Sequence, residues 1–223
     1  MSVFESARCR AAQAFIRLGS RTRSVKEPVI EDGPGALFSV PQLIRSSRLR
    51  KPLLVAGPDA GLWPERLCQT LEENDIPFSV WSEASVPPTA DDGESLRFFW
   101  VGEECDSFIA LGGPETIDLA KVAAARAVCP SKTVMSMIGR GKVGRRTAPV
   151  IAVPTAAGSG AESLGWATVS DAEGHRFRME DPALVPAMAV LDPALQADAP
   201  RPVLASCVMD GVCLAAEAYL SPF

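Results

Sequence analysis

The stretch DSFIALGGPETIDLAKVAAARAV, residues 106–128, contains the junction on which the fold depends. An apolar run from Phe108 to Leu111 meets two glycines and then a helical pattern from Thr116 to Val128. When a buried strand turns directly into a helix, the free N–H groups and positive dipole end of the helix lie at the turn. The stretch therefore predicts a strand, a glycine turn and a helix that together could hold a phosphate group.

Two residues of this turn oppose phosphate binding. Pro114 suits the first turn of a helix but has no N–H to donate. Glu115 stabilises the positive end of the helix, and the same carboxylate would repel an anion. On the turn alone, a phosphate site and a self-capped helix start are equally good interpretations.

Short apolar runs alternate with helical patterns around this turn. The expected strands are residues 53–57, 78–81, 108–111, 149–155 and 187–192, and the expected helices are 62–75, 90–103 and 116–128. Such alternation is typical of a parallel sheet covered on both faces. Residues 167–171 and 175–179, around a turn with Gly174, predict an antiparallel β-hairpin. The predicted fold class is α/β.

The character of the chain changes after Pro200. Residues 203–220, VLASCVMDGVCLAAEAYL, predict one helix with apolar or small residues on nearly every side. A helix of this kind is expected to be buried among other helices.

The first 27 residues differ in composition from the rest. Six basic residues stand there against Glu5 and Glu27, and apolar residues recur at helical spacing. Three interpretations remain open: a docked amphipathic helix, a membrane-surface helix, and an arginine- and serine-rich transit peptide. We favour a docked helix in a cytoplasmic protein, with a mitochondrial transit peptide second.

Overall composition limits the classes of partner. The net charge of −5 offers no global basic field for nucleic acid. No uninterrupted apolar run approaches the roughly 18 residues of a transmembrane segment. The six cysteines show no metal-ligand spacing and are expected to be reduced core thiols.

A second glycine-rich turn, VPTAAGSGAES at residues 153–163, follows the next strand of the predicted sheet. Thr155 and Ser159 offer hydroxyl groups, while Gly158 and Gly160 allow close backbone approach. Two such turns after consecutive parallel strands converge on one sheet edge, where a dinucleotide could lie.

Four motifs now support a family resemblance. LGGPETIDLAK, PVIAVPTAAGSGAES, LVPAMAVLDP and VMDGVCLAAEAY resemble, in order and spacing, the iron-containing (group III) alcohol dehydrogenase family, over about Pro28 to Ser221. The resemblance implies a parallel-sheet dinucleotide-binding domain followed by an all-helical domain. It also implies NAD or NADP and a divalent metal, iron for this family, in the cleft between them. The family interconverts alcohols and aldehydes or ketones.

The resemblance divides the chain into three parts. Residues 1–27 form the basic amphipathic extension, 28–193 the α/β NAD(P)-binding domain, and 194–223 the start of an incomplete helical metal-binding domain. The exposed face of such a partial domain predicts self-association, for example as a homo-oligomer, or poor solubility.

Site residues carry over unevenly from the family. The cofactor-binding set implied by the resemblance is Gly112, Gly113, Pro114, Glu115, Asp118, Thr155, Ser159 and Arg176. Pro114 and Glu115 replace a glycine and a serine that are usual in the family, and Ala156 has lost a hydroxyl. Gly57 stands where an aspartate commonly holds the adenosine ribose, which leaves NAD and NADP both open. The dinucleotide site is therefore expected to be weakened.

The implied metal site is less complete. Asp210 matches the family's aspartate ligand, whereas Leu214 stands where the next ligand, a histidine, is usual. A catalytic zinc or iron site generally needs at least three protein ligands. The only histidine, His175, is expected to be solvated in the hairpin turn. Cys213 shares a helix face with Asp210 but is expected to pack in the core, so Asp210 is interpreted as vestigial.

Two functional hypotheses follow. The first is an NAD(P)-dependent alcohol or aldehyde oxidoreductase of this family, acting on a small alcohol or aldehyde and impaired or inactive as this short chain. The alternative is a degenerate, non-catalytic nucleotide-binding or interaction module. Losses at Gly57, Pro114, Glu115 and Leu214 favour impairment.

Overall fold

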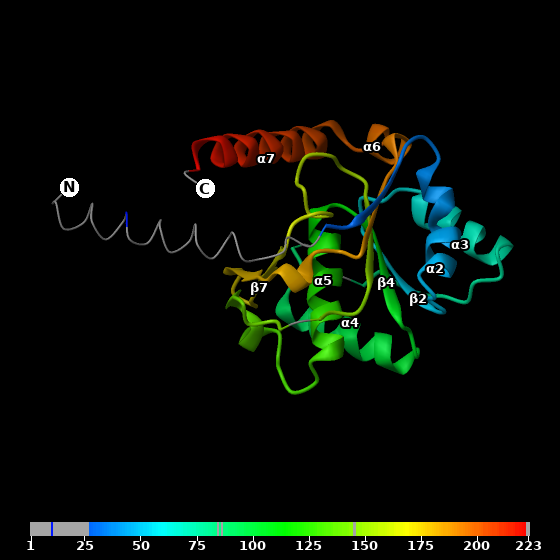
Figure 1. Ribbon diagram of the computed structural model, residues 1–223, viewed down its shortest axis with the longest axis horizontal. Coiled ribbons are helices and arrows are strands. Elements are labelled where there is room, and N and C mark those ends of the chain that lie inside the picture. The colour runs from blue at the N-terminus through cyan, green and yellow to red at the C-terminus, as the bar shows by residue number, and fades with distance from the viewer. Residues whose placement is uncertain (1–9, 11–26, 84, 86, 145, 222–223) are drawn as a thin grey trace.

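The computed structural model describes residues 10, 27–83, 85, 87–144 and 146–221 (Figure 1). Apart from residues 10 and 27, the basic N-terminal extension lies outside the described residues. Its assignment as a docked helix therefore stays a prediction.

Six strands form the main sheet, and every neighbouring pair is parallel. The strands are β1 (Val29–Asp32), β2 (Pro52–Ala56), β3 (Ser79–Trp81), β4 (Ser107–Gly112), β6 (Val150–Pro154) and β9 (Met188–Leu191). Their order is β1-β9-β6-β4-β2-β3. The register places Ile109 of β4 beside Leu54 of β2 and Ile151 of β6. The predicted parallel α/β fold is confirmed.

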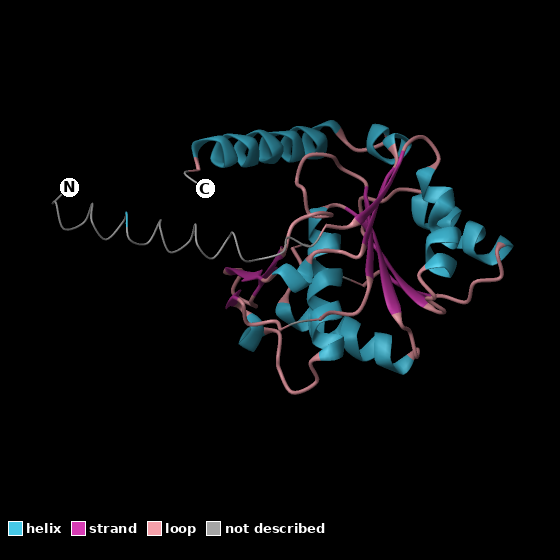
Figure 2. Cartoon of the chain, viewed as in Figure 1, coloured by secondary structure: helices cyan, strands magenta, loops and turns pink. Residues whose placement is uncertain are grey.

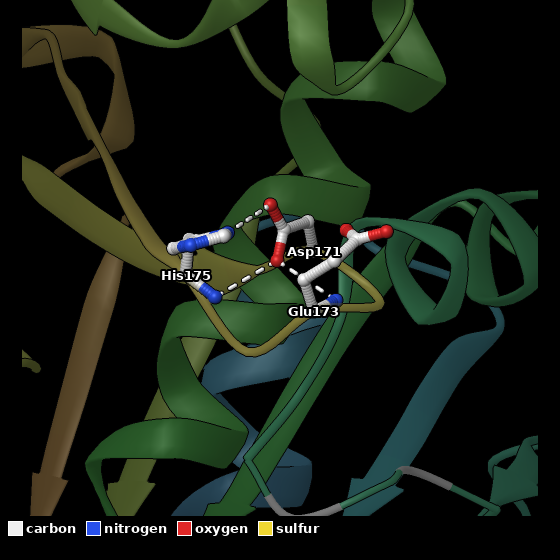
Figure 3. Close-up of side chains that lie close together, drawn as sticks. All are labelled: Asp171, Glu173 and His175. Carbon is white, nitrogen blue, oxygen red and sulfur yellow. Dashed lines mark hydrogen bonds and ion pairs between the residues drawn. The ribbon is translucent and has the colours of Figure 1, made fainter.

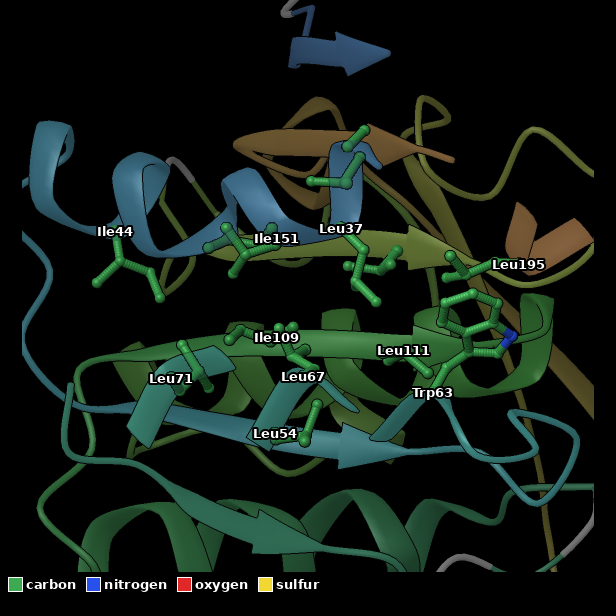
Figure 4. Close-up of a cluster of buried hydrophobic side chains, with 14 of the residues drawn as sticks. Leu37, Ile44, Leu54, Trp63, Leu67, Leu71, Ile109, Leu111, Ile151 and Leu195 are labelled. Atoms are coloured by element: carbon green, nitrogen blue, oxygen red, sulfur yellow. The ribbon is translucent and has the colours of Figure 1, made fainter. Parts of the chain in front are cut away.

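Helices cover both faces of this sheet (Figure 2). On one face lie η1 (Ala36–Ser39), α2 (Val40–Ser46) and α3 (Trp63–Glu73), and on the other α4 (Ala90–Gly102) and α5 (Pro114–Val128). Because successive strand residues point to opposite faces, Ile109 and Leu111 pack toward the first layer (Figure 4). Phe108 and Ala110 pack toward the second.

A small second sheet packs on the far side of α5. It contains β5 (Gly139–Arg140), β7 (Trp166–Ser170) and β8 (Arg176–Glu180), with η2 (Met135–Met137) and η3 (Pro182–Leu184) beside it. Strands β7 and β8 are antiparallel, so the predicted hairpin is confirmed. Helix α5 is consequently enclosed by two sheets, and its alanines allow both to approach closely.

The C-terminal helix differs from the prediction. After α6 (Pro193–Ala197), α7 (Arg201–Leu220) forms as expected, but among its residues only Cys207 is buried. Val212, for example, is 55% exposed. The expectation of burial among helices is wrong for the described residues, because nothing described covers the outer sides of α7. By length and composition α7 could cross a membrane; a single helix of this kind is a weak indication.

Some elements were not expected from the sequence. Strand β1 lies at the sheet edge, with Val29 and Ile30 largely exposed, so it has no signature of burial. Strand β5 has only two residues, which are too few to form a pattern in the sequence.

Candidate functional site

The candidate site is built where β2, β4 and β6 end. The N–H of Gly57 donates to the Leu111 carbonyl at 2.9 Å, and the N–H of Thr155 donates to the Gly112 carbonyl at 3.0 Å. These bonds hold the three turns side by side. A Cβ on Gly57 would lie 3.2 Å from the Gly112 Cα and 2.7 Å from an Asp59 carboxylate oxygen. The structure thus has no room at residue 57 for the aspartate usual in the family.

A carboxylate from another strand end lies at the start of α5. Gly113 is the N-cap residue, and Pro114 and Glu115 follow it in the helix. The Gly113 N–H donates to Asp59 Oδ1 at 3.4 Å, and the Thr155 hydroxyl donates to Asp59 Oδ2 at 3.1 Å. Glu115 is exposed. The turn thus receives a carboxylate from Asp59, in the loop after β2, and Glu115 Oε2 also lies near it, 3.6 Å from the position that a Cβ on Gly113 would take.

Sequence reasoning did not identify Asp59. It lies in a short loop, PDAG, where an aspartate is ordinarily a turn residue. Its position in the sequence could have identified it, because a loop directly after a parallel strand lies at the same sheet edge as the other two turns.

The second glycine turn contacts both the sheet and α7. Thr155 is buried, and Ser159 Oγ accepts a hydrogen bond from the Ala161 N–H at 3.4 Å. Gly158 has φ +114°, and a Cβ there would overlap the Cys207 carbonyl oxygen and lie 3.1 Å from the Val208 Cα. This turn therefore meets α7 backbone to backbone.

Asp118 and Lys121 connect α5 to the small sheet. Lys121 Nζ is fully buried and donates to the carbonyls of Leu164, at 2.9 Å, and Trp166, at 3.0 Å. It also lies 3.7 Å from Asp118 Oδ1. Asp118 Oδ2 accepts from the Thr168 N–H at 2.9 Å. Asp118, assigned to the cofactor by resemblance, thus also anchors β7.

Burial raises the pKa of Asp118 from 3.8 to about 6, against the opposing effects of Lys121 and the Thr168 N–H. Since the folded-state pKa exceeds the unfolded value, this group stabilises the fold most below about pH 4. That contribution is lost as the pH rises through about 6.

We expect the wild type to lose stability relative to Asp118→Asn as the pH rises from about 4 to about 7. The relative loss should be roughly 3 kcal/mol, because each pKa unit corresponds to about 1.4 kcal/mol. Urea unfolding of both proteins across this range measures it. A difference that does not change with pH would show that Asp118 has an ordinary pKa.

Two adjoining cavities open above the strand ends, and Pro88, Pro114, Glu115 and Asp210 line both. Of the sequence-predicted site residues, the first brings together Pro114, Glu115, Asp118, Ser159, Arg176 and Asp210. Gly112, Gly113 and Thr155 form the sheet edge beside them and are not among its lining residues.

The cavities are acidic. Their lining residues include four carboxylates, Asp59, Glu115, Asp118 and Asp210, and one basic residue, Arg176. Burial raises the pKa of the Cys207 thiol in the second cavity, and Asp210, Glu115 and Asp59 raise it further. A neutral thiol is a poor nucleophile and metal ligand. The charge balance disfavours a pyrophosphate.

The described residues do not fit a catalytic metal centre at Asp210. Asp210 is exposed on α7, with the apolar Leu214 one turn further on. Cys213 is exposed, which corrects the expectation that it packs in the core. Asp210, Cys213, Leu214 and Glu217 line a third cavity that lacks histidine.

Within the described ranges, one group of three side chains has metal-ligand character, and it lies in the hairpin turn (Figure 3). Asp171 Oδ1 accepts the backbone N–H groups of Glu173 at 3.0 Å and His175 at 2.8 Å. Asp171 Oδ2 lies 3.0 Å from His175 Nδ1. The His175 side chain is 72% exposed. These bonds stabilise the turn. Aspartate side chains commonly accept backbone N–H groups in this way.

Comparison with known proteins gives a consistent result. The profile of a family described as "Iron-containing alcohol dehydrogenase" matches residues 28–193. The chain is 26% identical over 204 residues to a choline dehydrogenase of Bacillus subtilis, covering 87% of this chain and 50% of that protein. It is 34% identical over 158 residues to the human mitochondrial hydroxyacid-oxoacid transhydrogenase, covering 67% and 33%.

Solved structures show the same fold. An alcohol dehydrogenase from Oenococcus oeni superimposes with a TM-score of 0.83 at 22% identity, covering 90% of this chain and 54% of that one. A sulfoacetaldehyde reductase from Bifidobacterium kashiwanohense, in complex with NAD+, gives 0.77 at 21% identity, covering 89% and 53%. The chain thus spans about half the length of these solved structures and half or less of the two curated relatives.

Proposed function

The chain belongs to the iron-containing alcohol dehydrogenase family, and from this premise we propose that it binds NAD(H) or NADP(H) where β2, β4 and β6 end. We further propose that it is the cofactor-binding part of an oxidoreductase acting on small alcohols or aldehydes. The family relationship and the position of the glycine turns support this assignment.

One observation carries the proposal. The Gly113 N–H and the Thr155 hydroxyl, from two neighbouring strand ends, converge on a single carboxylate. Two donors that hold a carboxylate have the chemistry needed to hold a phosphate oxygen. The positive end of α5 lies at the same point.

The chain's own residues would bind and orient the cofactor. The backbone of Gly112 and Gly113 allows close approach of the pyrophosphate, and Ser159 and Arg176 offer polar groups along the first cavity. A bound dinucleotide would supply the hydride donor or acceptor. Because the described residues do not fit a metal centre, the chain alone is expected to bind the cofactor without catalysing turnover.

A non-catalytic role is the second candidate. The exposed apolar side of α7, which includes Val208, Met209 and Val212, favours an interaction module. The first candidate requires NADH binding and an interaction module does not, so a rise in melting temperature with NADH would favour the first.

The proposed site can be tested with Gly113→Val. The Gly113 backbone has φ −72° and ψ −177°, which any residue adopts, and a Cβ there would lie 2.8 Å from Asp59 Oδ2. The valine would fill the phosphate position without straining the backbone. Millimolar NADH should raise the melting temperature of the wild type, and this rise should disappear in Gly113→Val.

Gly102→Val is the matched control, because a side chain at the end of α4 meets nothing within 4 Å. It should keep the NADH response. If Gly113→Val also keeps it, the dinucleotide binds elsewhere. No response in the wild type or in a variant that lacks the Asp59 carboxylate would leave only the interaction role.

A further inference from the structure

Asp59 holds the donors that a dinucleotide phosphate would need. Its two carboxylate oxygens accept from the Gly113 N–H at 3.4 Å and from the Thr155 hydroxyl at 3.1 Å. The positions that a Cβ would take on Gly57 and on Gly113 lie 2.7 Å and 2.8 Å from its two oxygens. The absence of side chains at these glycines makes room for the Asp59 carboxylate.

We propose that Asp59 is an internal anion that occupies the phosphate position, and that a dinucleotide binds only when this carboxylate leaves Gly113 and Thr155. The inference rests on the proposed function and concerns the regulation of that same site. A pyrophosphate and the Asp59 carboxylate are both negative and require the same donors. They cannot occupy the position together, because like charges without an intervening cation repel strongly at contact.

The surroundings of Asp59 leave space for its carboxylate to move away from Gly113 and Thr155. Asp59 is half-buried in the short loop between β2 and α3, and its side chain also lines the second cavity. A rotation of the side chain toward that cavity would free both donors while the sheet stays unchanged. The free energy of NADH binding to the wild type is therefore less favourable by the free energy needed to displace Asp59.

The test measures NADH affinity by calorimetry for the wild type, Asp59→Ala and Asp59→Asn. Asp59→Ala should bind NADH at least about tenfold more tightly than the wild type. Asp59→Asn should lie between them, because its amide has no charge but its oxygen still accepts from Gly113. A thermal melt of each protein verifies folding, and Asp59→Asn keeps the test valid if Asp59→Ala unfolds.

Glu65→Gln is the matched control, since it removes an equal charge from the first turn of the neighbouring helix α3, outside both cavities, without freeing the Gly113 N–H. It should change NADH affinity much less than Asp59→Asn. An equal gain would mean that overall charge, and not occupancy, limits binding, which overturns the inference. Adenosine, which has no phosphate, should bind the wild type and Asp59→Ala equally; a gain as large as that for NADH also overturns it.

The outcomes separate this inference from the proposed function. If the wild type binds NADH and Asp59→Ala binds it no more tightly, the inference alone fails. If neither the wild type nor the Asp59 variants bind NADH, both the proposed function and the inference fail.

Discussion

Lys121→Met should lower the free energy of unfolding by about 3–5 kcal/mol, the usual cost of removing one partner of a buried ion pair. Lys121 is fully buried in α5 and donates to the carbonyls of Leu164 and Trp166. Methionine has a similar length but no donor, so both carbonyls lose their partner. The Asp118 carboxylate, 3.7 Å from the ammonium group, would be left without a compensating charge.

Urea unfolding at neutral pH measures this loss. Lys142→Met is the control, because Lys142 is exposed and its substitution should change stability by less than about 0.5 kcal/mol. The double variant Lys121→Met/Asp118→Asn should recover part of the loss, since it removes the uncompensated charge. An unchanged urea midpoint for Lys121→Met would show that Lys121 does not stabilise the connection between α5 and β7.

Gly158→Ala should release α7 from the sheet edge. The residue has φ +114°, which costs about 1–3 kcal/mol for a residue with a side chain. Its Cβ would also overlap the Cys207 carbonyl oxygen, in the backbone of α7. A backbone cannot move aside as a side chain can, so the helix must shift. Because α7 is otherwise largely exposed, little else would hold it in place.

Hydrogen exchange across residues 201–220 measures the release, and we expect it to be at least about tenfold faster in Gly158→Ala. Gly144→Ala is a matched control, because Gly144 has φ +129° but a Cβ there meets nothing within 4 Å. It carries a similar backbone strain without the contact, and exchange in α7 should be unchanged. Equal acceleration in both variants would assign the effect to strain alone.

The fold was largely predictable because its signals are local. Buried strands such as β4 and β6 are short apolar runs, and helices such as α5 follow them with a different period. The edge strand β1 was missed because Val29 and Ile30 are exposed and so follow no burial pattern. The burial of α7 was wrongly expected because composition indicates that a helix can be buried, but not whether a covering surface is present.

The candidate site was predictable only as a location. The glycine turns after β4 and β6 lie at one sheet edge, and Pro114 and Glu115 lie beside it, while their role in cofactor binding stays a prediction. Asp59 was missed, and the Lys121 contacts were not foreseen, because neither residue belongs to a local pattern that implies its partner.

By itself, the sequence determined the parallel α/β sheet, the hairpin and the positions of the glycine turns, because burial periodicity and backbone freedom are properties of neighbouring residues. Only the tertiary structure decided what those turns hold. Asp59 meets Gly113 and Thr155 across separations of 54 and 96 residues, and Lys121 meets Leu164 across 43. Such contacts depend on the order of the strands within the sheet, because that order brings turns that are distant in the sequence to one edge.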